Sequence, residues 1–185
     1  MNHNSKKETF GEREDDLMIY FNWSANALVP VNPGAADTYL KENRPVILKI
    51  AQFLLQHLHY IPTRVYRGII LKEPVTVVAP KKGLEYLSFS ADRKVAEHFA
   101  DVKGFGSDVV NVAAQLGTHG YVIEYSPKIS EVLFHYHLLS RFPYAQAFNS
   151  LGIDGHQEVE FLKSQQEIMI LQPQDPFTTI TKQGK

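Results

Sequence analysis

The run TRVYRGIIL at residues 63–71 is the point at which the spacing of apolar residues changes from a helical to an extended period. From here onward, short runs rich in β-branched and aromatic residues are bounded by Gly, Pro, Asp or Lys, which is typical of strands. Six such runs predict six strands, at residues 63–71, 75–79, 84–90, 120–126, 132–138 and 167–171.

Two segments have helical spacing instead. Residues 36–60 predict a helix of roughly 13–16 residues that starts near Pro45 and ends before Pro62. Its apolar positions recur every three or four residues at Ile47, Ile50, Leu54, Leu55 and Leu58. Residues 91–101 predict a second helix with Ser90 available as its N-cap and with one apolar side formed by Val95, Ala96, Phe99 and Ala100. Strands interrupted by helices predict an α+β fold.

The ends of the chain differ from its middle in composition. Residues 1–16 carry eight charged side chains and a single large apolar one, which predicts a flexible charged tail. We expect one domain over residues 17–175, with a helical part at 17–62 and a β-rich core at 63–173, followed by a C-terminal tail at 176–185. Residues 101–118 and 140–164 contain several Gly and Pro, which predicts loops with short helical pieces.

Composition excludes several functional classes. The chain has 185 residues with 19 Lys and Arg against 20 Asp and Glu, so no overall charge favours nucleic acid or an anionic membrane. It has no cysteine, which excludes disulfides, thiolate catalysis and cysteine-bound metals. Apolar runs are too short to cross a membrane, and the N-terminus lacks the apolar core of a signal peptide. We therefore expect a soluble cytoplasmic protein with no membrane partner.

Common catalytic motifs give no guidance. The phosphate-loop, dinucleotide-fold, zincin and hydrolase-elbow patterns do not occur in the sequence. Two His-x-His pairs, His57/His59 and His135/His137, have a spacing that places both rings on one face of a strand. No carboxylate is spaced to complete a ligand set, so surface or half-buried histidines are the simpler interpretation and we predict no metal.

Three separated segments together suggest a site. In the first, Arg67 stands among apolar neighbours on a predicted strand and is followed by Gly68, whose backbone a ligand can approach closely. In the second, YLSFS at residues 86–90, alternation places Tyr86, Ser88 and Ser90 on one face, just before a helix. In the third, Glu167 heads a late apolar strand, with Gln165 two residues earlier on the same face.

This order of Arg-Gly on a strand, Ser-x-Ser before a helix and Gln-x-Glu heading a late strand resembles the mono-ADP-ribosyltransferases of the arginine–serine–glutamate class. That class includes bacterial toxins and transferases that bacteriophages use on host proteins. The resemblance covers roughly residues 63–173 and implies a split β-sheet core with an N-terminal helical segment. It implies that NAD is the substrate and that no metal is needed.

The resemblance also assigns roles to residues. It implies that Arg67 grips the diphosphate of NAD, that Ser88 orients the catalytic carboxylate and that Glu167 is this carboxylate, binding the ribose next to nicotinamide. It further implies that the backbone of Gly68 holds the carboxamide and that Phe99 packs near the nicotinamide. Ser90 is assigned to the same NAD-binding motif.

The implied reaction is transfer of ADP-ribose from NAD to a protein of the host cell, with release of nicotinamide, in the host cytoplasm if the enzyme is phage-encoded. A nucleic-acid acceptor stays open. In the family, glutamine two residues before the catalytic glutamate accompanies acceptors other than arginine, so Gln165 points to a non-guanidinium acceptor.

Alternatives remain at this point. The middle residue of the serine motif is Phe89, where the family has threonine. Glu158-Val159-Glu160 also fits Glu-x-Glu and would predict an arginine acceptor. We prefer Glu167 because four apolar residues and a proline follow it, as in a final sheet strand. The chain could instead hydrolyse NAD without an acceptor, be an inactive binding module of the same fold, or be an interaction protein whose strands only mimic the motif.

Overall fold

The computed structural model describes residues 10–29, 33–58, 62–101 and 119–183. Within these ranges lie five α-helices and six strands, which confirms the α+β class. In chain order the elements are α1 (Phe10–Leu28), α2 (Pro33–Leu58), β1 (Val65–Leu71), β2 (Tyr86–Ser90), α3 (Arg93–Ala100), β3 (His119–Tyr125), β4 (Val132–His135), α5 (Tyr144–Ser150), α6 (Gly155–Ser164), β5 (Glu167–Leu171) and β6 (Ile180–Lys182).

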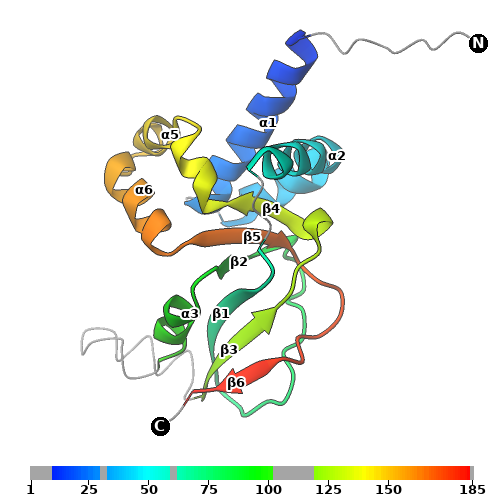
Figure 1. Ribbon diagram of the computed structural model, residues 1–185, viewed down its shortest axis with the longest axis vertical. Coiled ribbons are helices and arrows are strands. Elements are labelled where there is room, and N and C mark those ends of the chain that lie inside the picture. Colours follow the sequence, from blue (N-terminus) through cyan, green and yellow to red (C-terminus); the bar gives the residue numbers. More distant parts are fainter. Residues whose placement is uncertain (1–9, 30–32, 59–61, 102–118, 184–185) are drawn as a thin grey trace, which may run out of the picture.

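The sheet consists of two halves that are joined at one point. Its strand order is β4-β5-β2-β1-β3-β6, and all neighbouring strands are antiparallel. β1 pairs with β3 over seven positions and β2 with β5 over five, but β1 and β2 share only the pair Tyr66 and Ser90. The halves β4-β5-β2 and β1-β3-β6 therefore diverge beyond that pair, as Figure 1 shows.

Four helices, α1, α2, α5 and α6, lie on the β4-β5-β2 half (Figure 1). Their core contains the largest fully buried side chains, among them Trp23, Tyr20, Tyr144, Phe134 and Phe148. A second cluster joins the two halves of the sheet, because it combines Leu87, Phe89, Ile168 and Ile170 from β2 and β5 with Val65 and Ile123 from β1 and β3. The two halves thus share one apolar layer.

α3 packs directly on the other half of the sheet through glycine. A Cβ at Gly68 on β1 would lie 2.0 Å from the carbonyl oxygen of Ala96, and one at Gly120 on β3 would lie 1.9 Å from that of Ala100. Both distances are far below van der Waals contact, so only glycine allows the helix backbone to lie this close to the strands. The helix is held against β1 and β3 at these two points.

The predicted long helix is correct in position, and its proline has the expected place. Helical backbone geometry in α2 is interrupted at Asn43 (φ −115°, ψ 17°), so Pro45 lies in the first turn of the segment that follows. A proline fits there because the first backbone amides of a helix have no partner within the helix. The predicted N-cap of α3 is wrong, since the side chain of Asp92, and not that of Ser90, accepts from the backbone of Lys94.

Some predicted elements differ from the structure. Residues 10–16, expected in the tail, belong to α1, while residues 1–9 lie outside the described part. Residues 75–79 form no strand, and there only Val78 pairs, with Phe177. Pro74 and Pro80 flank this run and lack the amide that a ladder needs. Beyond His135 the predicted strand at 132–138 becomes a 3-10 helix.

The predicted C-terminal tail is wrong in part, whereas the short helical pieces predicted within residues 140–164 are present. β6 lies within residues 176–185, where Ile180 pairs with Ile123 of β3, and Phe177 is buried. Residues 140–164 contain the helices α5 and α6. The buried residues of α6 are only Gly155, Val159 and Leu162, so its apolar residues give a weak helical pattern in the sequence. Most of the predicted 101–118 loop lies outside the described residues. Across the described ranges, every helix is too short or too polar to span a bilayer.

Candidate active site

A cavity of about 260 Å³ lies where β1 and β2 diverge. Its walls come from four parts of the chain, β1, β2, α3 and the junction of α6 with β5. All seven site residues predicted from the sequence line it, namely Arg67, Gly68, Ser88, Ser90, Phe99, Gln165 and Glu167. The fold therefore brings together residues that are up to 100 positions apart in the sequence.

Arg67 bridges the gap between the halves of the sheet. Its Nη1 donates a hydrogen bond to the carbonyl oxygen of Ser88 on β2, across the region where the two strands no longer pair. Burial lowers the pKa of Arg67, and the negative charge of Glu167 raises it in partial compensation. A guanidinium stays protonated under such shifts, so Arg67 is a fixed positive charge on the cavity wall.

Glu167 is the first residue of β5 and the carboxylate of the cavity. Burial raises its pKa to about 7, while a hydrogen bond with the Ser88 side chain and the positive charge of Arg67 act in the opposite direction. Burial is the largest of these effects. Around neutral pH both the protonated and the ionised form of Glu167 are therefore populated. A pKa in this range is typical of catalytic carboxyl groups.

The turn that leads into Glu167 is fixed to the start of α3. Gln166 has a left-handed backbone (φ 48°), and its carbonyl oxygen accepts from the Ala91 amide at 3.1 Å. The Ser90 hydroxyl donates to the Gln165 carbonyl oxygen at 2.7 Å and accepts from the Asp92 amide at 2.9 Å. Two contacts therefore hold this turn, and the Ser90 hydroxyl is already used by the protein.

The structure adds to one assignment and changes another. Ser90 stays a predicted cofactor-binding residue, and its buried hydroxyl also positions the turn. Gln165 was predicted on the same strand face as Glu167, but it is the C-cap of α6, because that helix continues to Ser164 and the strand begins only after the left-handed turn. Gln165 still lines the cavity beside Glu167.

Two exposed aromatic side chains stand on the cavity wall. Phe99 of α3 is 43% exposed and Phe161 of α6 is 51% exposed. The exposure of Phe99 argues against a purely core-packing role for it. Phe161 was not among the residues predicted from the sequence, although it lies on the opposite face of α6 from the buried Val159 and Leu162.

The rival Glu-x-Glu pair lies elsewhere on α6. Glu160 is exposed and forms an ion pair with Lys163, with 2.8 Å between Oε1 and Nζ. Neither Glu158 nor Glu160 belongs to the cavity lining. An exposed glutamate in a surface ion pair is typical of a solvated helix face. The position of Glu160 therefore gives no indication of a ligand site.

The histidine pairs have other partners. His135 is fully buried, and burial, with His137 as a second cause, lowers its pKa to about 3. Its ring stacks on that of His137 at 4.9 Å between centroids. The Nδ1 of His57 bonds the Phe53 carbonyl, and His59 lies outside the described residues. The described segments contain no group of three side chains able to hold a metal.

A second, larger cavity of about 580 Å³ shares three wall residues with the first, Arg67, Gly68 and Phe99. Apolar side chains from the β1–β2 connection and from the segment before β6, such as Val78 and Phe177, line much of it. Arg67 therefore borders both spaces, so that an anion at its guanidinium could extend into either one.

Comparison with known proteins adds no identification, since no family model, no curated protein and no solved structure matches the chain.

Proposed function

We propose that this chain breaks the bond between ribose and nicotinamide in NAD and transfers ADP-ribose to a macromolecular acceptor, a protein of the host cell. One observation carries the proposal. Arg67, Ser88 and Glu167 come from three separate strands and line one cavity, in which Glu167 is hydrogen-bonded to Ser88 and faces the charge of Arg67.

The chemistry of the reaction requires these groups. Breaking the bond from ribose C1′ to the ring nitrogen gives an oxocarbenium-like transition state, which a nearby carboxylate stabilises. Nicotinamide leaves with the electron pair as a neutral molecule, the acceptor atom bonds to C1′ and the acceptor loses its proton. Glu167 supplies the negative charge. A forked guanidinium such as that of Arg67 can bind the diphosphate with paired charge-assisted bonds and so hold the ribose in place.

The space available also supports a dinucleotide. The smaller cavity alone lies below the roughly 300–1,000 Å³ that is usual for small-molecule sites. The two cavities that meet at Arg67 have volumes of about 260 and 580 Å³. A dinucleotide whose diphosphate sits at Arg67 would have one half on the side of Glu167 and the other on the side of the larger cavity.

The direct test is incubation of the purified protein with labelled NAD, with and without host-cell lysate. We expect nicotinamide release and a labelled macromolecule, and we expect both to be lost in Glu167→Gln, which removes the charge and keeps the shape. Glu160→Gln is the matched control, because it is the same substitution on a surface ion pair.

Full activity in Glu167→Gln together with loss in Glu160→Gln would move the catalytic assignment to α6. Nicotinamide release without a labelled macromolecule would favour NAD hydrolysis. If wild-type protein neither cleaves NAD nor gains thermal stability from it, an interaction protein is favoured; stabilisation without cleavage would indicate an inactive binding module.

The acceptor class follows from Gln165. Gln165 lines the cavity together with Glu167, and its side-chain amide, unlike a carboxylate, can neither take up a proton nor attract a guanidinium by charge. The proposal therefore extends to an acceptor other than arginine. Electron-transfer fragmentation of the modified protein locates ADP-ribose on its residue, and modification of arginine would contradict this assignment.

A further inference from the structure

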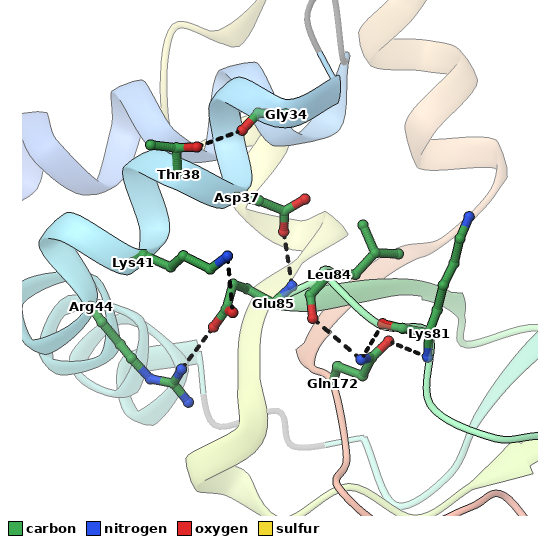
Figure 2. Close-up of polar contacts among 9 residues, drawn as sticks. All are labelled: Gly34, Asp37, Thr38, Lys41, Arg44, Lys81, Leu84, Glu85 and Gln172. Carbon is green, nitrogen blue, oxygen red and sulfur yellow. Dashed lines mark hydrogen bonds and ion pairs between the residues drawn. The ribbon is translucent and has the colours of Figure 1, made fainter.

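Asp37 of α2 is a buried carboxylate outside the proposed site. It is 7% exposed, and its Oδ1 accepts a hydrogen bond from the backbone nitrogen of Glu85 at 2.9 Å, as Figure 2 shows. Aspartate is almost never buried without a partner, since loss of water disfavours its charge. The partner here is the residue immediately before β2, so the contact ties the N-terminal part of α2 to the start of the strand that carries Ser88.

The same helix also holds the side chain of Glu85. Arg44 Nη1 lies 2.9 Å from Glu85 Oε2, and Lys41 Nζ lies 3.6 Å from Oε1 (Figure 2). The Glu85 side chain is only 20% exposed, which reduces screening of these pairs by water. Glu85 is thus held by α2 at both its backbone and its carboxylate.

Gln172, directly after β5, holds the same region from the other side. Its backbone nitrogen donates to the Glu85 carbonyl oxygen at 2.9 Å. Its side-chain amide donates to the carbonyl oxygens of Lys81 and Leu84, and its Oε1 accepts from the Lys81 nitrogen (Figure 2). The approach to β2 is therefore fixed between a helix and the neighbouring strand.

This anchoring matters because β2 has few hydrogen bonds on its other side. Leu87 and Phe89 pack there with Val65 and Ile123, but the hydrogen bonding with β1 consists of the single pair of Tyr66 with Ser90 and the bond from Arg67 to the Ser88 carbonyl oxygen. In the proposed reaction the diphosphate competes for that same guanidinium. When Arg67 turns to the substrate, the hydrogen bonds that still hold β2 at Ser88 are those of its ladder with β5 and of the anchored Glu85.

We propose, on the basis of the NAD-cleaving function above, that Asp37 is a positioning residue for the reaction: by holding Glu85 it keeps β2 in place, so that Ser88 stays hydrogen-bonded to Glu167 while Arg67 binds the diphosphate. Asp37 touches neither substrate nor Glu167. It acts through Tyr86 and Leu87, the two residues of β2 that separate Glu85 from Ser88.

The charge of Asp37 and its hydrogen bond have opposite effects on Glu167, which makes the proposal testable. The groups that act on Glu167 are Arg67 on β1 and the Ser88 hydroxyl on β2. Tyr86 on β2 lies near both carboxylates, and the charges of Asp37 and Glu167 add to burial in raising its pKa. A weaker Ser88 bond raises the pKa of Glu167, because that bond favours the carboxylate. Loss of a distant negative charge would instead lower this pKa.

Two substitutions separate the effects. Asp37→Ala removes both charge and acceptor, whereas Asp37→Asn removes the charge and keeps an oxygen that can accept from the Glu85 amide. For each variant, the pKa of Glu167 is followed by carbon-13 NMR of its carboxyl group, and kcat and KM for nicotinamide release are measured against pH. Lys49→Gln is the control, because it breaks a different α2 ion pair, with Asp16.

In Asp37→Ala we expect the pKa of Glu167 and the acid limb of kcat to rise by about 0.5 and kcat to fall about tenfold, with KM changed less than about twofold. Asp37→Asn and Lys49→Gln should resemble wild type. In a Ser88→Ala background, Asp37→Ala should cause no further change in the pH profile, since the two residues act on one contact.

The proposal is overturned if folded Asp37→Ala matches wild type, or if the Ala and Asn variants shift the pKa downward alike. Should Asp37→Ala fail to fold, Gln172→Ala provides the same test from the opposite side, with an upward shift expected and an unchanged pKa counting against the proposal. If wild-type protein does not cleave NAD, the proposed function fails, but the NMR titration still decides the role of Asp37.

Discussion

The two halves of the sheet are packed in different ways. The β4-β5-β2 half is covered by four helices through large side chains, among them Trp23, Tyr144 and Phe134. The β1-β3-β6 half packs on α3 through small residues, Ala96, Ala100 and two glycines. The first half is therefore stabilised by large side chains that fill its core, and the second by the absence of side chains where α3 contacts the strands. The candidate active site lies between the two halves. Adding or removing a single methyl group should therefore destabilise the two halves by unequal amounts.

The largest expected effect is that of one added methyl group on the glycine side. In Gly68→Ala the new Cβ would meet the backbone of Ala96 and Ala100, which cannot move without displacing α3. We expect a loss of about 3 kcal/mol in the free energy of unfolding, at the upper end for overpacking. Urea denaturation measures it.

The matched change in the other half removes a methyl group. Ile47→Val, at a fully buried position of α2, should cost only about 1 kcal/mol. Equal losses in the two variants would refute the comparison between a filled half and a half packed through glycine.

The next effect is the pH dependence of stability that His135 causes in the β4-β5-β2 half. Burial lowers the pKa of His135 from its usual value of 6.5 to about 3, so below pH 6.5 the unfolded chain binds a proton that the folded chain does not. Stability should therefore fall as the pH decreases from 6.5 towards 3, by about 2 kcal/mol between pH 6.5 and 5 if this group acts alone. Urea midpoints of wild type and His135→Asn, whose amide oxygen can accept from the His137 nitrogen, should differ in this pH dependence. Parallel curves would show that another group is responsible.

Glu167 at the boundary should show the opposite sign. Its folded pKa of about 7 lies above the usual 4.5, so its stabilising contribution is complete below pH 4.5 and is lost as the pH rises through 7. Glu167→Gln should accordingly be more stable than wild type at pH 8, by about 1–2 kcal/mol, while it loses activity. Thermal unfolding at pH 5 and pH 8 tests this, and a gain that is larger at pH 5 would contradict it.

The smallest expected effect concerns Ser90, which links the β4-β5-β2 half to the helix that packs on the other half. Ser90→Ala removes both contacts of the hydroxyl that joins the α6–β5 turn to the start of α3. We expect a loss of about 1 kcal/mol, together with faster hydrogen exchange at the Ala91 amide, which bonds the same turn. Ser150→Ala, which removes an exposed hydroxyl on α5, is the control and should change stability by less than about 0.5 kcal/mol. An equal loss in both variants would mean that Ser90 is no link.

Local sequence patterns were sufficient to predict the faces of the strands and the order of the motifs. Alternation in YLSFS places Leu87 and Phe89 in the shared core and Ser88 and Ser90 on the other side, as the structure has them. Such patterns are local, since a strand repeats every two residues and a helix every 3.6, and a short stretch of chain therefore contains the information. Where the pattern was weak, as in α6 with its three buried residues, only the cap at Asp154 could have signalled a helix.

Which of these elements meet depends on the packing of the whole chain and was not predictable from any one segment. The approach of Arg67 to Ser88, the hydrogen bond of Ser88 with Glu167 and the support of β2 by Asp37 all join residues far apart in the chain. This packing also decided the position of Gln165, because the end of α6 and the left-handed Gln166 remove it from the strand. Long-range pairing follows from the burial of the whole chain and not from any one segment, so neither these distances nor the pKa of Glu167 could be read from the residues alone.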